Sequence, residues 1–257
     1  MPNILDDLAS GGDGPMQRAQ RGMRPVLQKR FYKVASVGEA GGGFEVLLDG
    51  TSVKTPAKRA LVVPSRALAE ALAAEWTAQG DTIDPAAMPL TKLVNVAIDR
   101  VADEPGPVAD EIAKYSGSDL VCYRAGNPEG LVAAQSEAWN PVIDWAREEL
   151  GARFICSEGV QHVAQSAEAL AAVRAAIGTI KSPLALAALA SATALSGSAL
   201  IALALARGRL SADEAWNAAH VDEHWNIARW GEDEEAVQRL ASRRADFDAA
   251  AKVLGLV

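Results

Sequence analysis

Three residues near the C-terminus have the types and spacing of metal ligands. His220, Glu223 and His224 stand in the segment HVDEH, which fits the H-x-x-E-H pattern of the inverted zinc proteases. On one helix, His220 and His224 would lie a turn apart on the same side, as two ligands of one zinc ion must. One hypothesis from this pattern is therefore a zinc-dependent hydrolase that uses these three residues.

The rest of the sequence gives this zinc site little support. A catalytic zinc needs a third protein ligand and an open coordination position. The only other histidine, His162, is distant in sequence, and little chain follows His224 to supply a downstream glutamate. The sequence also lacks a nucleophile elbow, a phosphate-binding glycine loop and a paired Cys/His arrangement. It therefore favours a binding function without a cofactor over catalysis.

A helix expected over 212–230 gives these residues another role. At 100° per residue, Glu223 falls in the middle of a mostly apolar arc, which consists of Trp216, Ala219, His220, Glu223, Ile227 and Trp230. A carboxylate buried without a partner costs several kcal/mol. Glu223 is thus expected either to pair with another residue or to lie where another protein docks.

Arg244 is the intramolecular partner that the sequence offers to Glu223. It interrupts the apolar stripe of a last helix expected over 234–254, after a turn at Gly231. The two helices would then pack as an antiparallel pair. A Glu223–Arg244 contact and an outward-facing Glu223 both remain open at this point.

Composition narrows the class of protein. The chain has 257 residues, 49% of them hydrophobic and 23% charged, as expected for a soluble globular protein. Its net charge of -8 leaves no basic excess to neutralise phosphates, so a nucleic-acid partner is not expected. The two cysteines, Cys122 and Cys156, are far apart in sequence and are expected to be free thiols in a reducing cytoplasm.

The segment from Ser182 to Arg207 is long enough and apolar enough to raise the question of a membrane span. Serine, threonine and glycine residues occupy its middle, and alanine makes up much of the rest. These residues favour membrane insertion only weakly. We therefore expect two buried, packed helices and no membrane insertion, with a membrane-associated helical protein as the alternative.

The remaining pattern divides the chain into three parts. Residues 1–26 read as a mobile tail. Residues 27–104 combine strands around the glycine-rich GEAGGG connection with two helices, the first capped by Ser65. Residues 105–257 read as helices only, with Pro141 as a possible helix start and Ser211 and Glu214 as a capping box. The expected fold class is α+β, a small N-terminal domain followed by an all-helical C-terminal domain.

Several stretches together resemble one family across residues 30–235. They are RFYKV, LDG, KTPAKRALVVPS and EWTAQGDTIDPAAMPLTKLVNVAIDR in the N-terminal half, and SDLVCYRA, Gln135 with WNPVIDW, and DEHWNIARWGEDEE in the C-terminal half. The chain is similar to the assembly chaperones of the F-type ATP synthase catalytic sector that bind the α subunit. This resemblance implies a protein that is not an enzyme. Such a chaperone binds unassembled α subunit and prevents its aggregation until the β subunit replaces it.

The resemblance also implies where the partner binds. Glu223 stands at the acidic position before the W-G pair of the family pattern, and Trp230 and Gly231 are that pair. Glu232 and Asp233 follow and are included in the expected partner-binding set, because they could face a basic partner, although their residue types favour an acidic first turn of the last helix. Family members occur in mitochondria and related bacteria. The aspartates near the N-terminus favour the bacterial cytoplasm, and a monomer is expected when the protein is free.

Overall fold

The structure is a computed structural model that describes residues 27–159, 161–231 and 234–257. The expected tail, 1–26, lies outside these residues. Internal contacts divide the described chain into a small unit, 27–31 with 79–84, and a large unit, 32–78 with 85–257. In the small unit, strand β1 (Gln28–Lys29) pairs antiparallel with β6 (Thr82–Ile83).

A short antiparallel sheet opens the large unit. Strands β2 (Ala35–Ala40) and β3 (Gly43–Leu48) form the predicted hairpin, and β4 (Thr51–Ser52) and β5 (Val62–Val63) both pair with β3. Gly41 and Gly42 make the turn at φ 58° and 88°, where residues with a side chain are strained. Helix α3 (Arg66–Thr77) packs on β2 and β3, and the Ser65 hydroxyl caps it as expected, accepting from the Leu68 N–H at 3.1 Å.

Two further elements join the sheet region to the helices of the second half. After the short turn η1 (Pro85–Ala87), α4 (Pro89–Val96) continues into the π-helical turn η2 (Ala97–Val101). Both pack on α8, and α4 also packs on α12, within the large unit. The boundary expected after residue 104 stays a prediction.

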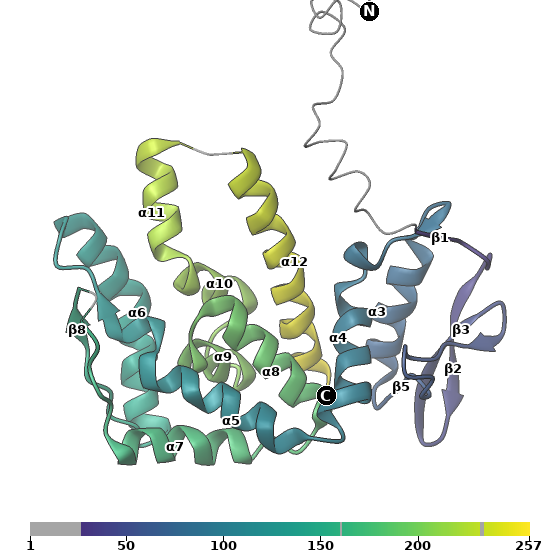
Figure 1. Ribbon diagram of the computed structural model, residues 1–257, viewed down its shortest axis with the longest axis horizontal. Coiled ribbons are helices and arrows are strands. Elements are labelled where there is room, and N and C mark those ends of the chain that lie inside the picture. The colour runs from purple at the N-terminus through teal and green to yellow at the C-terminus, as the bar shows by residue number, and fades with distance from the viewer. Residues whose placement is uncertain (1–26, 160, 232–233) are drawn as a thin grey trace, which may run out of the picture. The chain divides into compact units, whose positions relative to one another are not determined.

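The second half is almost entirely helical, as expected. Its longer helices are α5 (Pro105–Tyr115), α6 (Glu129–Glu149), α7 (Ala167–Gly178), α8 (Pro183–Ser196), α9 (Ala199–Ala206), α10 (Ala212–Ala219), α11 (Val221–Trp230) and α12 (Glu234–Leu256). Between α5 and α6 lie η3 (Ser116–Ser118), η4 (Leu120–Cys122) and β7 (Tyr123–Arg124), which pairs with β8 (Ser157–Glu158). Helix α8 packs against α5, α9 and α12 (Figure 1). The α+β fold class is confirmed.

The apolar segment 182–207 forms α8 and α9, as predicted. Gly197 ends α8 in the left-handed conformation at φ 70°, and the Ser198 hydroxyl caps α9. Every residue of α9 from Ala199 to Leu205 is buried. In the part of the chain that the structure describes, no helix has the length and apolar character needed to cross a membrane.

Two helix predictions in this half are wrong. Pro141 does not begin a new helix but lies inside α6. Trp139 and Trp145, on either side of it in the same helix, are buried in the core. The proline leaves the carbonyl of Glu137 without its usual helical donor. The helix expected over 212–230 is two helices, because the chain breaks at His220.

A candidate protein-binding surface around α11

The break between α10 and α11 is centred on a buried histidine. His220 is 1% exposed and has φ -121° and ψ 27°, outside the helical region. Its ring stacks on Trp216 at 3.8 Å, and its Nδ1–H donates to the Trp216 carbonyl at 2.9 Å. Burial lowers the pKa of His220, so the ring is neutral near pH 7. This packing turns α11 out of line with α10.

The break removes the geometry that the zinc hypothesis required. His220 lies buried at the end of α10, whereas His224 is exposed on α11, with ring centroids 6.4 Å apart. His162 is elsewhere, near the Tyr123 hydroxyl at 3.2 Å. The described residues contain no group of three His, Cys, Asp or Glu side chains arranged to hold a metal ion.

Glu223 does not lie in a buried arc, because the continuous helix on which that arc was drawn does not form. It is exposed in the first turn of α11, and none of the described residues forms an ion pair with it. Arg244 pairs instead with Asp213 and with Asp248, the latter at 2.8 Å. The expected Glu223–Arg244 contact is therefore wrong.

Helix α11 packs on α6 rather than pairing with α12, the partner expected from the sequence. Gly130 of α6 makes this approach possible, since a β-carbon there would lie 2.4 Å from the Trp225 ring. The amide of Gln135 adds a polar link. Its Nε2 donates to Asp222 at 2.7 Å, and its Oε1 accepts from the Ala125 N–H at 2.7 Å. The position of α11 therefore depends on α6.

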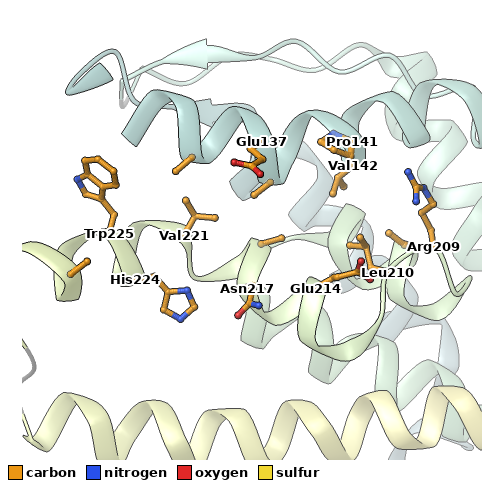
Figure 2. A pocket seen from close by; sticks show the side chains of 15 residues that line it. Glu137, Pro141, Val142, Arg209, Leu210, Glu214, Asn217, Val221, His224 and Trp225 are labelled. Atoms are coloured by element: carbon orange, nitrogen blue, oxygen red, sulfur yellow. The ribbon is translucent and has the colours of Figure 1, made fainter. Parts of the chain in front are cut away.

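A pocket of about 700 Å³ lies between α6 and the α10–α11 segment. Trp225 and Arg209 lie at its opposite ends, and α6 contributes Glu137, Pro141 and Val142 along one wall (Figure 2). Most of the remaining wall is alanine, valine and leucine. Glu137 is exposed and has no ion-pair partner among the described residues. The pocket is thus apolar inside, with the exposed Glu137 carboxylate beside it.

The end of α11 exposes a large aromatic side chain. Trp230 is 78% exposed, and Gly231 follows it at φ 85°. Glu232 and Asp233 lie outside the described residues.

We use the term α11 surface for Glu223, Trp230 and Gly231, the three described residues of the predicted partner-binding set. All three are exposed.

The tryptophans of the other family stretches have structural roles. Trp139 and Trp145 are buried, and the Trp139 Nε1–H donates to the Ala218 carbonyl at 2.6 Å. Trp76 is half-buried beside Tyr32. Trp225 and Gly130 were missed as site residues, because only the contact between α6 and α11 reveals their role.

Comparison with known proteins identifies the family. The family model described as ATP12 chaperone protein matches residues 29–147. A solved structure of Atp12 from Paracoccus denitrificans is 41% identical, with a TM-score of 0.80, and the match covers 89% of this chain and 97% of that one. The chain belongs to the ATP12 chaperone family. The family expected from the sequence motifs, the chaperones of ATP synthase assembly, is therefore confirmed.

Other relatives agree with this membership. A protein from Agrobacterium tumefaciens, named as a candidate chaperone, is 50% identical with a TM-score of 0.85, and the match covers 98% of this chain and 95% of that one. The mitochondrial protein atp12 of Schizosaccharomyces pombe is 24% identical over 81% of this chain and 75% of its own length. The family thus includes both bacterial and mitochondrial members.

Proposed function

We propose that this protein binds the unassembled α subunit of ATP synthase and prevents its aggregation until the β subunit replaces it. Membership of the ATP12 family supports the general role. The observation that carries the binding surface is Trp230, which is 78% exposed and lies on the same helix as the exposed Glu223. Exposed aromatic groups of this size are typical of protein contact sites.

The chemistry of the α11 surface suits a reversible interaction. A free subunit exposes an apolar interface that would otherwise self-associate, so its chaperone has to cover apolar area. Binding must still be weak enough for the true partner to displace the chaperone. An exposed carboxylate such as Glu223 contributes more to orientation and partner choice than to affinity.

The pocket beside α11 extends this surface. Its apolar walls fit the side chains of a client segment, and Trp225 at its end supplies a large aromatic face. The carboxylates of Glu137 and Glu223, which have no ion-pair partner among the described residues, favour basic residues at the edge of that segment. The α subunit would thus contact both the α11 surface and the pocket.

The proposed role includes no catalytic step, no cofactor and no nucleic acid. We place it in the bacterial cytoplasm, with the protein as a monomer until the client binds. The geometry of His220, Glu223 and His224 does not support a zinc-dependent hydrolase, and stoichiometric zinc in the purified protein would contradict the proposed role.

The test of this proposal compares Glu223→Lys with a matched control. Free α subunit is co-purified with the wild type, with Glu223→Lys and with Glu168→Lys. Glu168 is also an exposed glutamate in the first turn of a helix, α7, so both changes carry the same cost of placing a cation at a helix N-terminus. We expect Glu223→Lys to fold but to retain at least tenfold less α subunit, whereas Glu168→Lys retains as much as the wild type.

Two results would contradict the proposal at different levels. Equal retention by both variants and the wild type would remove Glu223 from the interaction. Failure of folded wild-type protein to retain any α subunit would reject the function itself.

Trp230→Ala, which leaves the charge unchanged, tests the apolar part of the contact separately. We expect this variant also to retain less α subunit than the wild type.

A further inference from the structure

The two cysteines, far apart in sequence, meet in the fold. Strands β7 and β8 pair in parallel with Tyr123 opposite Ser157, and each cysteine immediately precedes one of these residues. Residues at equivalent positions of a parallel pair point to the same face of the ladder. The side chains of Cys122 and Cys156 are therefore neighbours, and each thiol shifts the pKa of the other.

The two thiols differ in exposure and in acidity. Cys122 is buried and Cys156 is exposed. Interaction with the Cys122 thiol, followed by the nearby charge of Arg124, lowers the pKa of the Cys156 thiol. The same interaction, together with burial, raises the pKa of the Cys122 thiol. Cys156 is therefore the thiolate of the pair, and Cys122 keeps its proton.

Hydrogen bonds fix the position of the Arg124 guanidinium, whose charge lowers the pKa of Cys156. Its Nε donates to the Val121 carbonyl at 2.7 Å and its Nη1 to the Asn140 side chain at 3.0 Å. The guanidinium also lies over the Trp139 ring, 5.2 Å from its centre. A fixed cation beside an exposed thiol is the environment in which cysteines become reactive.

We propose that Cys156 and Cys122 form a peroxide-oxidisable dithiol site, in which Cys156 reacts first and Cys122 resolves it as an intramolecular disulfide. The Cys156 thiolate attacks one oxygen of hydrogen peroxide. The O–O bond breaks, hydroxide leaves and takes up a proton as water, and Cys156 becomes a sulfenic acid. Cys122 then loses its proton and attacks the Cys156 sulfur. The S–O bond breaks and a second water leaves, so two thiols are oxidised and one peroxide is reduced to two waters.

A metal site is the competing use of two adjacent cysteines. Zinc bound by thiolates needs further ligands, and the described residues contain no third His, Cys, Asp or Glu grouped with this pair.

The disulfide would connect the two ends of the segment that contains α6, which forms one wall of the pocket. The site is nevertheless independent of the proposed client, and its test does not involve the α subunit.

The test oxidises the full-length, fully reduced protein with equimolar hydrogen peroxide and follows its mass. We expect the wild type to lose two hydrogens without dimerising and to yield a peptide that links Cys122 to Cys156. Cys122→Ser is expected to stop at a Cys156 sulfenic acid that dimedone traps, and Cys156→Ser to stay unmodified under the same conditions. Circular dichroism checks that each variant folds, and Cys122→Ala replaces Cys122→Ser if the buried hydroxyl unfolds it.

A pH profile distinguishes a reactive thiolate from a cysteine that is merely exposed. The rate at which iodoacetamide alkylates Cys156 is expected to reach half its maximum below the ordinary cysteine pKa of about 8.5. In Arg124→Gln this midpoint is expected to move upward. An ordinary midpoint in the wild type, a disulfide only between molecules, or stoichiometric zinc released on oxidation would each overturn the proposal.

Discussion

At the scale of single residues, Asp119 is a buried charge that connects two parts of the helical region. Its carboxylate is fully buried and accepts from the Leu200 N–H at 3.1 Å and the Val121 N–H at 3.3 Å. The Leu200 N–H belongs to the first turn of α9, where backbone donors have no partner within the helix. Burial outweighs these hydrogen bonds and raises the pKa of Asp119 to about 6.

This raised pKa predicts how stability depends on pH. The folded state holds the Asp119 proton more tightly than the unfolded chain, so the free energy of unfolding falls as pH rises from about 4 to about 6. The loss is on the order of 3 kcal/mol. In Asp119→Asn this contribution is absent, while one side-chain acceptor remains.

Urea denaturation of both proteins at pH 4 and pH 7 measures this effect. Other groups titrate in this range, His220 in the opposite direction, but they contribute equally to both proteins. The stability of the wild type relative to the variant should therefore be greater at pH 4. A difference between the two proteins that does not change with pH would show that the buried charge of Asp119 does not control stability.

At the scale of secondary-structure elements, the sequence predicts where helices begin better than it predicts which helices pack against each other. Caps at Ser65 and Ser211 mark helix starts correctly, because a cap depends only on residues within one turn. The break at His220 was missed, because it depends on stacking against Trp216 and on the core behind it. That single error placed Glu223 in a buried arc and α11 against α12.

The contact between α6 and α11 predicts an effect of one methyl group. Gly130→Ala adds a β-carbon that would overlap the Trp225 ring, whereas Gly106→Ala, also in the first turn of a helix, meets no atom within 4 Å. Alanine gains about 1 kcal/mol over glycine in a helix, and overpacking costs about 1–3 kcal/mol. We expect Gly130→Ala to be less stable than Gly106→Ala by about the overpacking cost.

Denaturation monitored by circular dichroism compares the two glycine variants. Gly130→Ala should also retain less α subunit than Gly106→Ala, because the displaced Trp225 forms one end of the pocket. Equal stability and equal retention of α subunit would mean that Gly130 does not position α11.

At the scale of the whole molecule, hydrophobic patterning and the motif set were sufficient to predict the α+β class, the order of the elements and the family. Patterning predicts these features because a segment such as α9, which consists of apolar residues throughout, is buried whatever its neighbours are. It could not reveal the pocket or the meeting of Cys122 with Cys156, since both arise from segments far apart in the chain. The lack of a catalytic motif favoured a binding protein without indicating which helix binds.

The proposed function requires the whole protein to protect free α subunit and to release it to the β subunit. Light scattering during refolding of α subunit, with and without an equimolar amount of this protein, measures this protection. We expect the protein to suppress scattering and the addition of β subunit to free the chaperone as assembly proceeds. Aggregation of α subunit at the same rate with and without the folded protein would rule out this function.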